Sequence, residues 1–378
     1  MSTINDETHE LFRDSFRSFV NDRMLPHYDQ WEADGIMDRS VYAEAGKHGF
    51  VGMAIPEQYG GGGTKDFRFN AVISEELANA GIGGAGLGIG LHNDITTPYF
   101  IEYCNEEQAA RWLPGIASGE LITAIAMTEP GTGSDLASIA TSAVRDGDEF
   151  VINGAKTFIT NGINSDVVIV VCRTGEGRAG LSLIVVERGM PGFERGRNLD
   201  KIGQHSADTA ELFFSDVRVP VANLLGEEGR GLEYLSSNLA QERLSIGVNG
   251  LHTARAAFRW TVDYVKERTA FGKAIGSFQN TKFVLAEVKT EIDVTVPFIE
   301  QCITKLNAGE LSAAEAAQAK LWASELQGRT LDRCLQFFGG YGYTSEYPIG
   351  RAYADARVTR IYGGTSEIMK TIIAKEIL

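Results

Sequence analysis

The sequence has few cysteines, no metal-binding pattern of histidines and no excess of basic residues. It contains four cysteines and six histidines in 378 residues. They form neither a CxxC pair nor HxxxH or HExxH spacing, so we expect reduced, buried thiols and no metal site. The net charge of −15 disfavours nucleic acid and anionic membranes as partners, because both bind basic surfaces.

Long apolar runs are also missing. The longest, VVIVV at 167–171, is far too short to span a bilayer. The first ten residues, MSTINDETHE, are acidic and polar, unlike an Arg-rich presequence or a signal peptide. We therefore expect a cytoplasmic protein with no membrane partner. The length and a hydrophobic content of 43% allow two or three domains with buried cores.

The pattern along the chain changes twice. Apolar residues recur at helical spacing over 8–25, where Pro26 is expected to end the run, and helical segments continue to about residue 120. Short runs rich in Val, Ile and Phe follow, separated by Asp-Gly and Asn-Gly turns. They predict a sandwich or barrel of antiparallel strands. Long helices then return and suggest a four-helix bundle. We predict a mainly helical α+β protein with domains at 1–121, 122–231 and 232–378.

Glycine-rich stretches are the first candidate binding sites. GIGGAG at 81–86 matches GxGxxG, but a helical segment precedes it instead of the strand that a Rossmann fold requires. A closely packed helix connection and a pocket wall of small residues are the alternatives. MTEPGTGSD at 127–135 exposes several backbone amides, which favours an anion or a polar ring edge, or merely a tight loop with a polar cap.

Two helix ends offer similar alternatives. KERTAFGK at 266–273 places Arg268 where it can capture a phosphate, or where it simply compensates the helix dipole. LQFFGGYGYTSEYP at 335–348 contains a glycine pair among aromatic residues, which an ordinary helix stop also explains.

Glu242 is the most informative charged residue. It falls on the apolar stripe of a predicted helix, together with Leu235, Leu239 and Ile246. Burial raises the pKa of a carboxyl group towards the range that suits a general base. The alternatives are a salt bridge to the adjacent Arg243 and a wrongly assigned helix face.

The last motif is IYGGTSEIM at 361–369. Thr365 or Ser366 can cap the helix that follows, and Glu367 suits its first turn. Capping does not explain the pair Gly363–Gly364, which indicates that another group comes close to the backbone here.

Taken together, these motifs resemble the acyl-CoA dehydrogenase family over nearly the whole chain. The stretches that carry the resemblance are IAMTEPGTGSDLASI, FITNG, DTAELFFSDVRVP, LLGEEGRG, ERTAFGKAIGSFQ, QFFGGYGY and RIYGGTSEIM. QERL, AKLWASELQ and YGGTSEIMK are most similar to the long-chain subgroup. The resemblance implies an N-terminal helical domain, a middle β domain and a C-terminal four-helix bundle. It also implies a homotetramer that binds FAD without a Rossmann fold.

The resemblance implies two sets of FAD contacts. The contacts expected from the middle domain are Ile125, Met127, Thr128, Ser134, Phe158 and Thr160. The contacts expected near the FAD of a neighbouring subunit are Arg268, Gln279, Gln336, Gly339 and Gly340, of which the last three meet the diphosphate. Phe271 is a further expected FAD contact. Thr365 and Glu367 complete the set at the final helix.

The resemblance also implies the chemistry. Many members carry a catalytic glutamate at the position of Gly363, but the long-chain and isovaleryl subgroups carry this base on a bundle helix, where Glu242 stands here. Glu242 is then expected to take the α-proton of an acyl-CoA while flavin N5 accepts the β-hydride, giving a trans-2-enoyl-CoA. The Gly363 N–H is expected to bind the thioester carbonyl. The expected substrate contacts are Ser134, Arg243, Tyr362, Gly363 and Gly364.

Electrons are expected to pass to electron-transferring flavoprotein. Acyl length and branching stay open: the glycines at 81–90 either leave room for an acyl tail or permit close helix packing, and the loop at 173–180 is shorter than in long-chain relatives. The alternatives are a flavin oxidase or monooxygenase on the same fold, and a catalytically inactive homologue that acts as a binding or assembly subunit.

Overall fold

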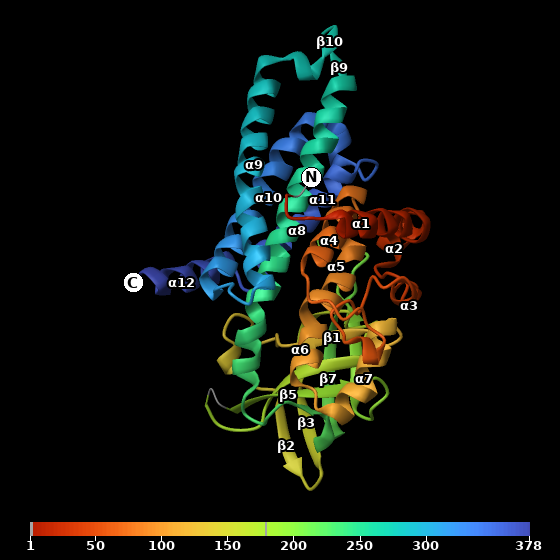
Figure 1. Ribbon diagram of the computed structural model, residues 1–378, viewed down its shortest axis with the longest axis vertical. Helices are drawn as coiled ribbons and strands as arrows, with labels where there is room; N and C mark the ends of the chain where they lie inside the picture. Colours follow the sequence, from red (N-terminus) through yellow and green to blue (C-terminus); the bar gives the residue numbers. More distant parts are fainter. Residues whose placement is uncertain (1–2, 178–179) are drawn as a thin grey trace.

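The computed structural model describes residues 3–177 and 180–378. A β domain lies at one end of an elongated molecule, and long helices run from it toward the other end (Figure 1). The N-terminal helices pack beside the long helices and, through the last two of them, on the sheet. They are α1 (Glu7–Phe19), α2 (Leu25–Asp34), α3 (Ser40–Lys47), α4 (Arg68–Ala80), α5 (Gly83–Gly90), α6 (Thr97–Tyr103) and α7 (Glu106–Ser118).

The first helix does not end at Pro26, so that prediction was wrong. A π-helical turn over Val20–Met24 joins α1 directly to α2, and Pro26 lies in the first turn of α2. The N–H groups of a first helical turn have no intrahelical acceptor, so proline costs little there.

The middle domain contains a mixed sheet, which corrects the purely antiparallel prediction. Its strands are β1 (Thr123–Ala126), β2 (Ser142–Asp146), β3 (Glu149–Thr160), β4 (Val167–Arg173), β5 (Leu181–Glu187), β6 (Phe193–Asn198), β7 (Thr209–Pro220) and β8 (Leu224–Leu225). The order is β6-β7-β3-β2-β4-β5-β8, and β1 lies beside β4. β4 runs parallel to both β1 and β2. The β2–β3 hairpin supplies the long connection that parallel pairing requires.

Strand β4 is apolar on both faces because two cores cover it. Val167, Ile169 and Val171 pack with Phe100 of α6 and Trp112 of α7 in one core. The intervening residues of the strand face a second core, formed with the inner sides of β3 and β7. A strand that is buried on both faces reads as a continuous apolar run, which explains VVIVV without a membrane. Within the described part of the chain, no helix is long and apolar enough to cross a bilayer.

The C-terminal helices extend away from the sheet. They are α8 (Gly231–Glu267), α9 (Gln279–Asn307), α10 (Ala313–Phe338), α11 (Pro348–Ala356) and α12 (Ser366–Ile377). A small hairpin of β9 (Thr269–Ala270) and β10 (Lys273–Ala274) joins α8 to α9 at the end of the molecule opposite the β domain (Figure 1). α8 and α10 approach closely, because a Cβ on Gly247 would lie 3.0 Å from the Ala319 backbone and one on Gly250 would lie 2.9 Å from that of Ala323.

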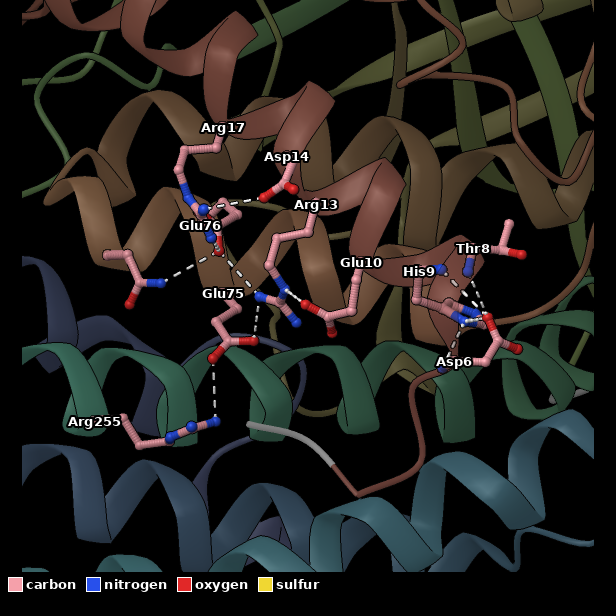
Figure 2. A network of polar contacts seen from close by, with 11 residues as sticks. Asp6, Thr8, His9, Glu10, Arg13, Asp14, Arg17, Glu75, Glu76 and Arg255 are labelled. Atoms are coloured by element: carbon pink, nitrogen blue, oxygen red, sulfur yellow. Dashed lines mark hydrogen bonds and ion pairs between the residues drawn. The ribbon is translucent and has the colours of Figure 1, made fainter.

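A network of charged side chains fixes the N-terminal helices on α8 (Figure 2). Glu75 of α4 accepts a hydrogen bond from Arg13 of α1 at 2.7 Å and pairs with Arg255 of α8 at 3.2 Å. Burial opposes ionisation of Glu75, but His252, Arg255 and Arg13 together lower its pKa to about 2. The carboxylate therefore stays charged at neutral pH and connects three helices.

Candidate active site

The side chain of Glu242 is buried in the middle of the molecule. It lies on α8 and is only 4% exposed. Burial raises the pKa of its carboxyl group to about 7, although a hydrogen bond from Tyr99 and the charge of Arg243 both lower it. Tyr99 Oη, from α6, donates to Glu242 Oε1 at 2.8 Å. An acid with a pKa near neutrality is suited to proton transfer.

Arg243 is buried beside this acid without a close contact to it. Its Nε has no hydrogen-bond partner among the described residues, and it acts on Glu242 only through the electrostatic field. Burial lowers the pKa of Arg243. The salt-bridge alternative therefore lacks a direct contact, whereas an unpaired buried donor is typical of a site that receives a polar ligand.

The glycine pair lies against α8, one helical turn from Glu242. A Cβ on Gly363 would lie 2.4 Å from Cδ1 of Ile246 and 3.5 Å from Cε of Lys320. The φ angles of Gly363 and Gly364 are +62° and +95°, which side chains disfavour. These contacts explain the missing side chains. Among the described residues, no acceptor binds the N–H of Gly363.

The helix that follows begins as the motif predicts. Thr365 is the N-cap of α12, its hydroxyl accepts from the N–H of Ile368, and Glu367 lies in the first turn. Tyr362, just before the glycines, is held neutral because burial raises its pKa to about 12.

The loop at 127–135 is fixed by a buried ion pair that the sequence did not reveal. Lys156 Nζ donates to Glu129 Oε1 at 2.9 Å and to the carbonyl of Met127 at 3.0 Å. The N–H of Thr157 donates to the carbonyl of Thr128 at 2.9 Å. The pair holds the Met127–Thr128 backbone beside β3, while Ile125 is buried in β1 and Ser134 is exposed.

Phe158 projects from β3 at a bulge in the strand. The register of β3 and β7 shifts between Lys156 and Ile159, and Phe158 has a φ of +59° and is 67% exposed. A left-handed conformation costs a bulky residue ~1–3 kcal/mol and often marks a ligand site. Thr160 follows, half-buried, at the end of the strand. The bulge thus exposes an aromatic ring beside the 127–135 loop.

A second group of predicted contacts lines a hollow at the far end of the bundle. The hollow measures about 380 Å³ and is lined by Arg268, Gly339, Gly340 and neighbouring aromatic residues. A Cβ on either glycine would meet nothing within 4 Å, so the backbone is open to a ligand. Phe271 in the adjacent hairpin is 96% exposed. Gln279 and Gln336 are exposed but lie outside the lining.

Within one chain, the buried acid Glu242 and the hollow at Arg268 lie far apart. Glu242 and Arg268 lie about 39 Å apart along α8, at roughly 1.5 Å per residue. The β domain and the β9–β10 hairpin occupy opposite ends of the molecule (Figure 1). The Arg268 hollow of a chain is therefore remote from Glu242 of the same chain.

The GxGxxG stretch is a helix connection, as its context indicated. Gly81 ends α4 in a left-handed conformation and α5 follows directly. A Cβ on Gly84 or Gly88 would collide with Ser206 Oγ at 2.6 Å or with Tyr42 Oη at 2.2 Å, but a Cβ on Gly90 would meet nothing within 4 Å. Close packing thus explains why residues 84 and 88 are glycines, whereas the space around Gly90 is open.

Two further predictions concern other parts of the chain. The loop at 173–180 contains residues 178–179, which lie outside the described residues, so its substrate contacts stay untested. All four cysteines are free, and three are buried as expected, but Cys104 is only half-buried.

The fold and the site together define a flavin-dependent oxidoreductase of helical–β–helical architecture. Family models for the N-terminal, middle and C-terminal domains of acyl-CoA dehydrogenase match residues 6–120, 124–217 and 229–378. The chain belongs to the acyl-CoA dehydrogenase family, whose members use FAD and act on CH–CH groups. The open backbone at Gly339 and Gly340 beside Arg268 fits a diphosphate, and the ring of Phe158 fits a flavin.

Similar proteins cover the whole chain. The mitochondrial long-chain specific acyl-CoA dehydrogenase of Sus scrofa is 48% identical over 98% of this chain and 86% of its own length. An acyl-CoA dehydrogenase of Bacillus subtilis (strain 168) is 35% identical over 97% of each chain. The crystal structure of acyl-CoA dehydrogenase from Geobacillus kaustophilus is 49% identical, has a TM-score of 0.97 and matches 100% of both chains.

Proposed function

We propose that this protein oxidises the Cα–Cβ bond of an acyl-CoA thioester to a trans-2-enoyl-CoA, with Glu242 as the base. The observation that carries the proposal is the position of Glu242. Its carboxyl group is buried and has a pKa of about 7, and Ile246, one turn along α8, is the side chain nearest to Gly363. A base and a free N–H donor thus meet in one region of the protein.

Different residues of the chain orient the base, bind the thioester oxygen and contact the rest of the substrate. Tyr99 holds Oε1 of Glu242, which leaves Oε2 to accept the α-proton. The unpaired N–H of Gly363 binds the thioester oxygen and stabilises the negative charge that develops there when the proton leaves. Ser134, Arg243 and the Tyr362–Gly364 backbone complete the substrate contacts. Bound FAD supplies the acceptor for the β-hydride. Catalysis then requires that the substrate be held with its α-carbon beside Glu242 and its β-carbon beside the flavin.

The separation of the two cofactor groups supports a shared FAD. The loop at 127–135, Phe158 and Thr160 bind the flavin of one chain, and the Arg268 hollow of a second chain binds its diphosphate. Two chains related by a two-fold axis satisfy both groups, since each supplies one set to the other. The assembly is a homotetramer built from such dimers, and electron-transferring flavoprotein accepts the electrons.

A long, unbranched acyl chain is the substrate class we favour. A Cβ on Gly90 would meet nothing within 4 Å, and we infer that an extended tail lies along the end of α5. The long-chain enzyme of Sus scrofa, at 48% identity, supports the same choice.

The test uses purified protein and a panel of thioesters. We expect a yellow protein with one FAD per subunit, whose flavin is bleached anaerobically by acyl-CoA thioesters from butyryl-CoA to arachidoyl-CoA, fastest with long chains. Branched thioesters are included as a comparison. A protein that does not take up FAD, or whose flavin no thioester reduces, would refute the proposal and favour a binding subunit. Fast reoxidation of the reduced flavin by oxygen would favour an oxidase.

A further inference from the structure

A buried lysine lies directly beneath the glycine pair. Lys320 is on α10 and is 1% exposed. Its Nζ donates to the carbonyl oxygen of Gly364, and its Cε lies 3.5 Å from the position of a Cβ on Gly363. The lysine side chain therefore binds the carbonyl of Gly364 and occupies the space next to the missing side chain of Gly363.

The charge of this lysine has no counterion among the described residues. Burial and, to a smaller extent, the positive charge of Arg243 together lower the pKa of Lys320 to about 8. A buried ammonium group is costly unless it is paired. A buried methionine of similar length would fill the space at a lower cost. This difference in cost indicates that the charge of Lys320 has a role beyond packing.

Hydrogen bonds to α10 hold the residues on both sides of the Gly363–Gly364 loop. On one side of the glycines, Thr359 Oγ1 donates to Gln327 Oε1 at 2.8 Å, and on the other, Ser366 Oγ donates to Glu325 Oε1 at 3.0 Å. Both acceptors are on α10. The flanks of the loop are thus anchored on this helix, but two adjacent glycines have many backbone conformations available. Lys320 is the side chain of α10 that holds the glycines themselves.

We propose that Lys320 is a positioning residue that fixes the Gly363–Gly364 backbone so that the Gly363 N–H points at the thioester carbonyl oxygen. This inference rests on the proposed function, since it concerns the same carbonyl. By fixing Gly364 from below, Lys320 limits rotation of the loop against Ile246. Its charge also lies beside the loop on which the thioester oxygen becomes negative, where a fixed cation stabilises that charge.

The test compares ligands with and without a carbonyl group. A trans-2-enoyl-CoA has the thioester oxygen, and the S-alkyl-CoA thioether of equal chain length lacks it. Wild-type holoenzyme is expected to bind the enoyl-CoA more tightly. In Lys320→Met, the affinity for the enoyl-CoA should fall about tenfold or more, because a small misplacement of a donor has a large effect. The affinity for the thioether should be unchanged.

Ser324→Ala is the matched control. It removes a hydrogen bond from a buried side chain to a carbonyl of the same helix and has no hydrogen bond to the glycine loop, so it should leave both affinities unchanged. The carbonyl stretch of bound ¹³C-labelled enoyl-CoA gives a second readout, and its red shift should be smaller in Lys320→Met. Lys320→Arg, which keeps the charge and a donor, should restore the preference for the carbonyl ligand.

Two results would overturn the inference: an equal loss of affinity for both ligands in Lys320→Met, or no loss for either. If that variant does not fold, Lys320→Gln is measured in the same way, with the same expectation. If the wild-type protein itself binds neither ligand, the proposed function fails first. If the wild type prefers the carbonyl ligand and Lys320→Met does so equally, only the role of Lys320 fails.

Discussion

Tyr99 Oη donates a hydrogen bond to Glu242 Oε1 at 2.8 Å, and this contact joins α6 of the N-terminal helices to α8 of the bundle. Both side chains are buried. A hydroxyl that donates to a carboxylate favours its charged form. Tyr99 therefore opposes the effect of burial, which raises the pKa of Glu242 to about 7, and it keeps part of the base ionised near neutral pH.

Tyr99→Phe should shift the pH dependence of kcat/KM. Removing the hydrogen bond raises the pKa of Glu242, so the rise of activity with pH moves to higher pH. A hydrogen bond to a charged group contributes ~1.5–3 kcal/mol, which corresponds to a shift of ~1–2 pH units. Activity should fall near pH 6 and recover in alkaline solution. Tyr103→Phe, on the same short helix, is the control and should leave the profile unchanged. A uniform loss at every pH in Tyr99→Phe would contradict the assignment.

Glu242→Gln should abolish chemistry but not binding. The amide keeps the shape of the side chain and can still accept from Tyr99, but it cannot take a proton. Flavin absorbance and acyl-CoA affinity should persist while the rate of flavin reduction falls by more than ~10⁴-fold, beyond the ~10²–10⁴ of general-base removal alone, because hydride loss depends on proton removal. Glu233→Gln, an exposed carboxylate of α8, should be close to wild type. Activity near the wild-type level in Glu242→Gln would show that Glu242 is not the base.

The sequence predicted that Glu242 is buried on the apolar face of a helix, but it did not predict the contacts from Tyr99 and Lys320. The burial of Glu242 was predictable because helical periodicity places side chains on faces, and this information is local. Tyr99 and Lys320 touch the site from other helices, and no local pattern distinguishes a buried tyrosine or a lysine in an alanine-rich helix from ordinary core and surface residues. The parallel pairing of β1 with β4 was missed for the same reason, since strand partners distant in sequence depend on the whole sheet.

A glutamate at residue 363 should be able to replace Glu242 as the base, provided that Ile246 is made smaller. Gly363→Glu in the Glu242→Gln background restores the arrangement of the commoner family members, but its Cβ would lie 2.4 Å from Ile246 Cδ1. The double variant should therefore regain little activity, and adding Ile246→Ala should make flavin reduction measurable again, chiefly with short unbranched thioesters, because the new side chain narrows the site. Ile246→Ala alone is the control. Absence of recovery in the triple variant would argue against a base that can act from residue 363.

A substitution at Gly90 tests whether the acyl tail binds in the open space at the end of α5. A Cβ on Gly90 would meet nothing within 4 Å, so Gly90→Leu should keep or raise the melting temperature, since leucine favours a helix by ~1 kcal/mol over glycine. The kcat/KM ratio of long-chain to short-chain thioesters should fall about tenfold or more. Gly84→Ala, whose Cβ would lie 2.6 Å from Ser206 Oγ, should instead destabilise the protein without changing this ratio. An unchanged ratio in Gly90→Leu would place the tail elsewhere.

Arg268 tests whether two chains share each FAD. Arg268→Ala removes an exposed side chain from the far end of α8, so it should not disturb a core. A charge-assisted hydrogen bond to a phosphate contributes ~1.5–3 kcal/mol, and the Kd for FAD should rise ~10–100-fold. Lys266→Ala, two residues earlier and also exposed, should leave the Kd unchanged. A monomeric protein that retains FAD tightly would contradict a shared site.

Mixing two defective variants makes this test decisive. Phe158→Asp weakens the flavin end of the site and Arg268→Ala weakens the diphosphate end. Phe158 is part of β3 in the β domain, whereas Arg268 joins α8 to β9 in the hairpin at the opposite end of the molecule (Figure 1). In a mixed dimer, one site combines the intact Phe158 of one chain with the intact Arg268 of the other, while the second site carries both changes. Unfolding and refolding the two variants together should therefore produce sites with the wild-type Kd for FAD, which neither variant has alone. If each chain built its own site, every site in the mixture would carry one change, and the wild-type Kd would not return.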